Sequence, residues 1–269
     1  MPRSHSIRIE PGTRFTLDRV DPDDTGPFRD KAQAQARLRK DLELLPELQY
    51  RLYADGTRAV LVVLQAIDTG GKDGVIRHVM SGLNPAGCAV TSFKVPSAEE
   101  RAHDFLWRIH RAVPPLGVIG VFNRSHYEDV LVVRVHKLVP EKTWRARYGQ
   151  INEFERILTA NGVSLVKILL HISRQEQAQR LRARIEDPTK NWKFSVQDLE
   201  ERRLWKSYME AFEDAVNECG TPWAPWHVVP ANRKWYRDAV VARLLRDHLE
   251  SLRLRYPKPS VDLSKIVIR

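Results

Sequence analysis

Cysteine is scarce in this sequence, and long hydrophobic runs are missing. The two cysteines, Cys88 and Cys219, lie far apart and form no CxxC pair, which excludes a disulfide framework and a zinc site of the usual spacing. The longest clean apolar stretch, from Ala59 to Leu64, is far shorter than the about 20 residues that cross a bilayer. No apolar segment follows Met1, so we expect no secretory signal. These absences predict a soluble protein of the reducing cytoplasm.

Acidic residues are fewer than basic ones in this sequence. The sequence has 44 Lys and Arg residues against 34 Asp and Glu, which gives a formal net charge of +10. Such an excess indicates a polyanionic partner, either nucleic acid, an anionic membrane surface or a phosphate-rich substrate. The sequence contains no zinc-finger spacing, RNP motif, basic-region zipper or strongly basic amphipathic helix. We therefore expect neither a nucleic-acid partner nor a membrane partner.

Buried strands alternate with helices along a length that fits a single domain of residues 1–269. Four runs are apolar on both alternating faces, which is typical of central parallel strands: 58–67, 117–122, 164–171 and 226–229. A fifth run, 89–95, alternates more and is expected nearer an edge. Helical patterns cover 29–53, 98–112, 141–160, 174–186, 196–218 and 232–254, with a kink or break at Pro46. The predicted fold class is α/β, a parallel sheet sandwiched by helices.

Two segments lie outside this alternation. Residues 1–27 are rich in Pro, Gly, Asp and Arg without periodicity, which predicts an extended N-terminal arm. About fifty residues separate the run ending near His171 from the run starting near Trp226. An ordinary crossover between parallel strands needs about a dozen residues. The excess predicts an inserted helical hairpin at 174–222, and in α/β enzymes such an insertion is usually a lid.

A glycine-rich turn follows the first buried run directly: Asp68, Thr69, Gly70, Gly71, Lys72, Asp73 and Gly74. Adjacent glycines let successive backbone N–H groups converge, the next helix adds its positive end, and a lysine adds a full charge, so the turn can cradle an anion. It is not a strict Walker A motif, because Ala66 takes the place of the first glycine and Asp73 that of the Ser or Thr. Asp68 and Arg77 place a negative and a positive charge at the opening of this turn, which indicates that it binds phosphate together with magnesium.

A second polar cluster follows the run 117–122, and it contains Asn123, Arg124, His126, Glu128 and Asp129. Asn123 takes the place where P-loop enzymes carry a metal-binding acid. Because asparagine is a neutral ligand, Asp68 and the two later carboxylates would have to meet the metal charge. Arg124 can clamp a transferring phosphoryl group with two parallel hydrogen bonds. His126 is interpreted as a core or surface histidine.

The predicted hairpin carries a third group of candidates: Arg180, Arg184, Lys190 and Lys193. A solvated helix face explains such charges as readily as a function does. Their place on an insertion favours function, because a mobile cationic lid could close over a polyanion and exclude water. Trp192 and Phe194 either flank a base or anchor the hairpin to the core, and we favour anchoring.

These segments together resemble the polyphosphate kinase 2 family. The resemblance rests on LQAIDTGGKDG at 64–74, FNRSHYEDVL at 122–131, PTKNWKF at 188–194, DLE at 198–200 and RRLW at 202–205. It extends in order from about residue 29 to residue 256. Asn123, followed by Glu128 and Asp129, is similar to the class III branch, whereas other branches tend to carry aspartate at the Asn123 position.

The resemblance implies a P-loop kinase-like fold with a helical lid, and transfer of the terminal phosphoryl group of inorganic polyphosphate to AMP and ADP. It implies Mg²⁺, with Mn²⁺ as a substitute, adenine and secondarily guanine nucleotides, and a homodimer or homotetramer. The implied catalytic residues are Asp68, Lys72, Arg124 and Asp129. The implied metal ligands are Asp68, Asn123 and Glu128. The implied substrate-binding residues are Gly70, Gly71, Lys72, Asp73, Gly74, Arg77, Arg180, Arg184, Lys190 and Lys193. A conventional ATP-dependent nucleotide kinase of the P-loop type is the alternative.

Overall fold

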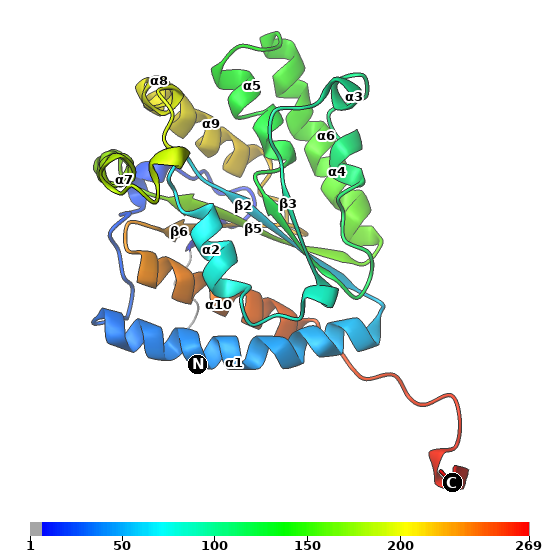
Figure 1. The fold of residues 1–269 in the computed structure, drawn as a ribbon. Helices are drawn as coiled ribbons and strands as arrows, with labels where there is room; N and C mark the ends of the chain where they lie inside the picture. The colour runs from blue at the N-terminus through cyan, green and yellow to red at the C-terminus, as the bar shows by residue number, and fades with distance from the viewer. Residues whose placement is uncertain (1–6, 269) are drawn as a thin grey trace.

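The computed structural model describes residues 7–268 and places six strands in one sheet, in the order β1-β6-β5-β2-β4-β3 (Figure 1). The strands are β1 (Ile7–Arg8), β2 (Ala59–Gln65), β3 (Cys88–Ser92), β4 (Ile119–Asn123), β5 (Val163–His171) and β6 (Trp226–Pro230). Strands β2 to β6 pair in parallel, and every residue of β2 is buried. The predicted parallel sheet is confirmed, as is the edge position of the fifth run, now β3.

Helices cover both faces of the sheet (Figure 1). Their bounds are α1 (Lys31–Asp55), α2 (Lys72–Val79), α3 (Ala98–Arg101), α4 (Trp107–His110), α5 (Val132–Val135), α6 (Glu141–Ala160), α7 (Arg174–Glu186), α8 (Gln197–Arg203), α9 (Trp205–Glu218) and α10 (Lys234–Ser251). Helices α1, α2 and α10 pack together on one face, and α6 and α9 lie on the other. None of the described helices is long and apolar enough to span a membrane.

Three details of the predicted helices are wrong. The helix predicted over 98–112 is two short helices, because the Asp104 carboxylate accepts the N–H of Leu106 and starts a new turn. The helix predicted over 196–218 is divided at Leu204, which ends α8 and begins α9. Helix α1 continues through Pro46 without a break, and Gly56, whose φ of 62° suits a left-handed cap, ends it.

The N-terminal arm contacts β6 and α9, which come from the C-terminal part of the sequence. Strand β1 pairs antiparallel with β6, an arrangement that the composition of the arm did not predict. Further along, the backbone N–H groups of Phe15 and Leu17 donate to side chains of α9, and Leu17 is buried. The part of the predicted arm before Ile7 lies outside the described residues.

The predicted insertion has two unlike halves. Helix α9 packs its apolar face, with Ala211, Phe212 and Val216, into the main core. Helices α7 and α8 lie away from the sheet at the side of the molecule (Figure 1). Residues 187–196, which we call the lid turn, join these two helices and are mostly exposed.

Candidate functional site

The glycine-rich turn lies between the carboxyl end of β2 and the first residue of α2. A Cβ on Gly70 would stand 2.4 Å from the Cβ of Ala66, so only glycine fits there. Gly71 has a φ of 106°, and Thr69, although not a glycine, has a φ of 65°. The predicted sequence of strand, glycine turn and helix is therefore present, and left-handed residues bend its backbone into a cradle. Open α/β sheets bind ligands at this edge.

Lys72 lies inside this turn rather than in solvent. Its side chain is buried, and its Nζ donates to the carbonyl oxygen of Ala66 at 2.9 Å. Burial lowers the pKa of Lys72, and the nearby Arg124 guanidinium lowers it further, while Asp68 opposes both. A desolvated ammonium with so few protein partners is well placed to pair with an anion that enters the turn.

Arg124 bridges the two predicted clusters. Its Nη2 donates to Asp68 Oδ1 at 2.8 Å, and its Nη1 lies 3.9 Å from Glu128 Oε2. The residue has a φ of 63°, a left-handed conformation that costs a residue with a Cβ about 1–2 kcal/mol. Strained backbone of this kind is concentrated at functional sites. Here it turns the chain at the end of β4, so that the guanidinium lies across the mouth of the glycine turn.

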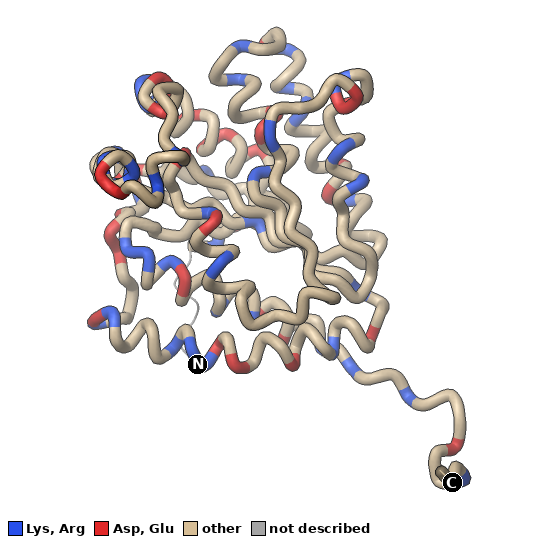
Figure 2. Tube along the Cα trace, in the orientation of Figure 1, with Lys and Arg blue, Asp and Glu red and all other residues tan. Residues whose placement is uncertain are grey.

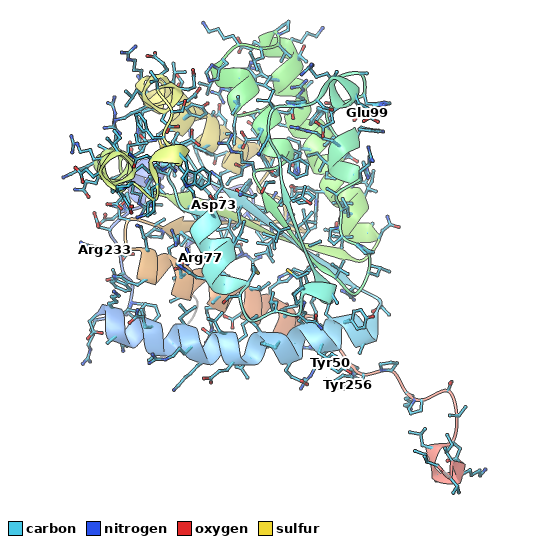
Figure 3. All side chains as sticks on the ribbon, viewed as in Figure 1. Tyr50, Asp73, Arg77, Glu99, Arg233 and Tyr256 are labelled. Carbon is cyan, nitrogen blue, oxygen red and sulfur yellow. The ribbon has the colours of Figure 1, made fainter. Side chains whose placement is uncertain are left out.

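The remaining members of the second cluster lie at two depths. Asn123 Nδ2 donates to Asp73 Oδ1 at 2.9 Å, which ties the end of β4 to the first turn of α2, where Figure 3 labels Asp73. Glu128 is mostly buried, and burial raises its pKa against the opposing charges of Arg124 and Lys72. Asp68, Lys72, Asp73, Asn123, Arg124 and Glu128 are thus all brought to one edge of the sheet.

Asp129 pairs with an arginine outside this group. Its carboxylate accepts from Arg147 Nη1 at 3.0 Å, and its side chain is 13% exposed. Burial raises the pKa of Asp129 to about 6, although the Arg147 and Arg108 guanidiniums pull it down. A carboxyl group that titrates near neutrality is suited to proton transfer or to a pH-dependent contact.

Two lid arginines bond to the protein itself. Arg180 donates to the carbonyl oxygens of Thr69 at 2.8 Å and Ala231 at 2.6 Å, so it braces the glycine turn against the end of β6. Arg184 Nη1 lies 3.4 Å from Asp198 Oδ2, across the two ends of the lid turn.

Arg77 and the two lysines of the lid turn, Lys190 and Lys193, are exposed. Lys190 pairs with Asp187, and the Lys193 ammonium lies 5.0 Å from the centre of the Trp192 ring. Arg77 lies on the outer face of α2 (Figure 3). Figure 2 shows acidic residues mixed with basic ones over α7 and α8. Trp192 is 78% exposed, so the expectation that it anchors the hairpin to the core is wrong.

A buried polar network forms the floor beneath the second cluster. Lys167 Nζ donates to Glu155 Oε2 at 2.6 Å and to the Tyr127 hydroxyl at 2.8 Å. His126 Nε2 lies 3.2 Å from Glu155 Oε1, and burial lowers the pKa of this histidine. All four side chains are buried. The interpretation of His126 as a core residue is therefore confirmed, and the network fixes the turn that carries Glu128 and Asp129.

Sequence reasoning missed three residues of the site. Gln65 is the last residue of β2 and lies 3.0 Å from the Ser125 hydroxyl; a polar residue inside an apolar run was the signal that could have found it. Arg147 holds Asp129 from α6, and Arg237 of α10 lies against Gly71 and Gly74. Nothing in the sequence marked either arginine, because both come from helices distant in the chain.

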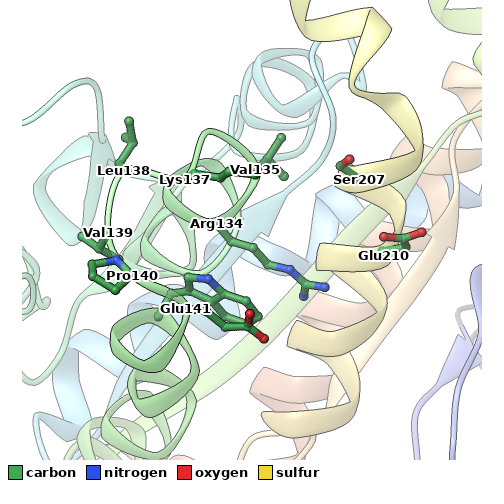
Figure 4. Close-up of a pocket in the computed structure, with 10 residues that line it drawn as sticks. Arg134, Val135, Lys137, Leu138, Val139, Pro140, Glu141, Ser207 and Glu210 are labelled. Carbon is green, nitrogen blue, oxygen red and sulfur yellow. The ribbon is translucent and has the colours of Figure 1, made fainter.

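A cavity of about 650 Å³ lies between α5, α6 and α9 (Figure 4). It is lined by Arg134, Val135, Lys137, Leu138, Val139, Pro140, Glu141, Trp144, Ser207 and Glu210. None of the predicted site residues lines it. The chemistry indicated by the sequence therefore lies at the glycine turn and not in this cavity.

The glycine turn suits a magnesium ion that is shared with phosphate. Among residues 7–268, no three His, Cys, Asp or Glu side chains gather as a ready-made metal cage. Mg²⁺ rarely needs one, because it is commonly held by one or two carboxylates together with substrate phosphates and water. Asp68 is part-exposed at the mouth, and the Thr69 hydroxyl is buried there without a hydrogen-bond partner among the described residues. Oxygen ligands of this kind fit the ion.

Comparison with known proteins agrees with this geometry. The family model described as polyphosphate kinase 2 matches residues 28–256. An AMP/ADP-polyphosphate phosphotransferase of Meiothermus ruber is 52% identical over 97% of this chain and 98% of its own length. An ADP-polyphosphate phosphotransferase of Rhodopseudomonas palustris is 45% identical over 95% of this chain and 93% of its own length. The crystal structure of polyphosphate kinase 2 from Arthrobacter aurescens superposes with a TM-score of 0.92 at 45% identity, covering 96% of this chain and 92% of that one. The chain therefore belongs to the polyphosphate kinase 2 family.

Proposed function

We propose that this chain is a polyphosphate-dependent nucleotide kinase that transfers the terminal phosphoryl group of inorganic polyphosphate to AMP and ADP. The observation that carries the proposal is the convergence of Lys72 and Arg124 on one glycine turn whose mouth also holds Asp68. Phosphoryl transfer needs this combination, because the protein's task is to align two phosphate groups and to neutralise charge on their oxygens.

Each residue has a distinct part in this proposal. The backbone of Gly70 and Gly71 and the ammonium of Lys72 bind the terminal phosphate of the nucleotide. Arg124 leaves Asp68 when substrates enter and spans the transferring group, because its guanidinium already lies across the mouth. Asp68, together with Asn123 and Glu128 of the second cluster, would hold Mg²⁺, which when bound supplies positive charge to the phosphate oxygens. Asp129 orients the acceptor or takes up a proton.

The lid and α2 would guide the polyphosphate chain. Arg77, Lys190 and Lys193 are exposed cations on these elements and can contact successive phosphates. Arg180 and Arg184 would join them only when the lid rearranges, because both now bond to the protein. We further propose a homodimer or homotetramer, and the reducing cytoplasm as the compartment, which the free thiols of Cys88 and Cys219 support.

The names of the similar proteins differ in the nucleotide that accepts the phosphoryl group. The Meiothermus ruber relative is named for AMP and ADP, and the Rhodopseudomonas palustris relative for ADP alone. We propose both acceptors here, because identity to the first is higher and Asn123 with Glu128 and Asp129 is similar to the class III branch.

An ATP-free assay tests the proposal. The protein is incubated with polyphosphate, Mg²⁺ and either AMP or ADP, and the products are separated by chromatography. We expect ADP from AMP, ATP from ADP, and no product when polyphosphate or Mg²⁺ is omitted. Product from AMP only when ATP replaces polyphosphate would identify a conventional nucleotide kinase and overturn the proposal. Product from ADP alone would restrict the acceptor to diphosphates.

A further inference from the structure

Arg237 lies against the glycine turn from beneath, although it comes from the opposite end of the chain. It is only 2% exposed and belongs to α10, which packs beside α2. A Cβ built on Gly71 would stand 2.0 Å from Arg237 Nη1, and one built on Gly74 would stand 2.8 Å from Nη2. The guanidinium therefore occupies the space that these two glycines leave open. Any side chain at either position would collide with it.

A buried acid fixes the orientation of this guanidinium. Asp238 Oδ1 accepts from Arg237 Nε at 2.8 Å and from Nη2 at 2.6 Å. The other oxygen of Asp238 lies 2.8 Å from His78 Nδ1, at the end of α2. With two nitrogens held by one carboxylate, the planar group cannot turn, and its remaining nitrogen, Nη1, faces Gly71.

The turn is thus held between two guanidiniums. Arg180 reaches it from the lid, and its Nη1 would lie 3.6 Å from a Cβ on Gly71. Lys234 is close enough to both arginines that, after burial, their charges are the next causes that lower its pKa. Positive charge is therefore gathered around the backbone of the glycine turn.

We propose that Arg237 is a positioning residue for the phosphate-binding turn. Its rigid guanidinium sets the backbone of Gly71 to Gly74 so that the N–H groups point at one phosphate before any ligand arrives. This inference rests on the proposed function for the identity of the ligand. Breaking a buried ion pair is costly, but a change that keeps a cation beside Asp238 does not leave this acid unpaired, so we expect such a change to affect ligand binding more than folding.

The test compares Arg237→Lys with Arg233→Lys, a matched change at an exposed arginine of the same segment. Lysine keeps the charge but not the planar group. We expect the Kd for tripolyphosphate and the KM for the nucleotide to rise at least tenfold in Arg237→Lys. We expect kcat to stay within about threefold and the melting temperature within a few degrees, because a preset turn binds ground and transition states alike. Arg233→Lys should match the wild type.

Glycine substitutions supply the second arm of the test. Gly74→Ala should weaken tripolyphosphate binding in the wild-type background and have a much smaller effect in the Arg237→Lys background, since a lysine chain can move away from the added methyl. Gly149→Ala, at a helical glycine with nothing within 4 Å, is the control and should not weaken binding.

The outcomes separate this inference from the proposed function. Tripolyphosphate binding is measured by calorimetry and does not depend on turnover, so it remains informative even if the ATP-free assay fails. Wild-type Kd and KM in Arg237→Lys would overturn the inference. So would a lower melting temperature with unchanged KM, or additive effects of Gly74→Ala and Arg237→Lys.

Discussion

At the scale of single residues, Lys72 and Asp68 are the most exacting parts of the site. Lys72→Ala removes the only ammonium within the turn, and Asp68→Asn removes the carboxylate that Arg124 contacts. We expect each to lower kcat by about 100-fold or more, because charge neutralisation is the main contribution to phosphoryl transfer. Circular dichroism and thermal melting should show an intact fold.

The control for both variants is Lys206→Ala. Lys206 lies on α9 with a side chain that is 91% exposed, and its change should leave turnover unaltered. Turnover near the wild-type rate in both Lys72→Ala and Asp68→Asn would refute the assignment of the site.

Asp129 predicts a pH dependence. Burial raises its pKa to about 6, so the carboxyl is neutral below that pH and ionised above it. Orientation of the acceptor, proton uptake and metal binding all need the ionised form. We expect kcat/KM to fall toward tenfold per pH unit below about pH 6 and to level off above it. Asp129→Asn should retain residual activity without this step, and a wild-type profile that is flat through pH 6 would contradict the assignment.

At the scale of elements, the Asp198 carboxylate links the two ends of the lid turn. Asp198 Oδ2 lies 3.4 Å from Arg184 Nη1 and accepts the N–H of Ser195 at 3.2 Å. Asp198→Ala should loosen residues 187–203 and raise the KM for polyphosphate about three- to tenfold, since each lost bond is worth about 0.5–1.5 kcal/mol. Hydrogen exchange followed by mass spectrometry should show faster exchange there and not in α9.

Glu200→Ala is the matched comparison for this change. Glu200 belongs to the same helix, but it pairs with the exposed Arg203 one turn away. It should alter neither hydrogen exchange nor KM by more than a small factor, and equal effects of the two variants would rule out a closing role for Asp198.

Strand β5 and helix α6 are joined by the buried pair of Lys167 and Glu155. Lys167→Met leaves the Glu155 carboxylate in the core without its cation, and we expect a loss of about 3–5 kcal/mol in unfolding free energy. Arg156→Met, which breaks an exposed pair with Glu153 on the same helix, should cost less than about 1 kcal/mol. Denaturant titration measures both, and similar losses would contradict the buried network.

Elements with a strong local pattern could be predicted from the sequence, and contacts between distant helices could not. The bounds of α6 and α7 match the prediction, because Pro140 precedes the first residue of α6 and the Ser173 side chain caps the start of α7. Arg246 of α10 pairs at 2.6 Å with the buried Asp41 of α1. The two residues lie 205 positions apart in the sequence, so no local pattern predicts their contact. The same holds for Arg237 at the glycine turn.

At the scale of the whole molecule, the net charge of +10 predicts salt-sensitive binding of the donor. If the protein neutralises about two phosphates, the Kd for long-chain polyphosphate should rise about tenfold between 50 and 200 mM NaCl. We expect duplex DNA of similar charge not to be retained under the same conditions. Filter binding with both polymers measures the difference, and comparable affinity for DNA would reassign the charge to nucleic-acid binding.

The pairing of β1 with β6 has a consequence for the order in which the chain is made. Ile7 lies opposite Val228, so during synthesis the first strand of the described sheet must wait for the last one. At translation rates of about 5–20 residues per second, that delay is about 10–40 s. Phe15 and Leu17 wait almost as long for α9. During synthesis the strands around the glycine turn can therefore form first, and the sheet acquires its β1 edge only after β6 has been made.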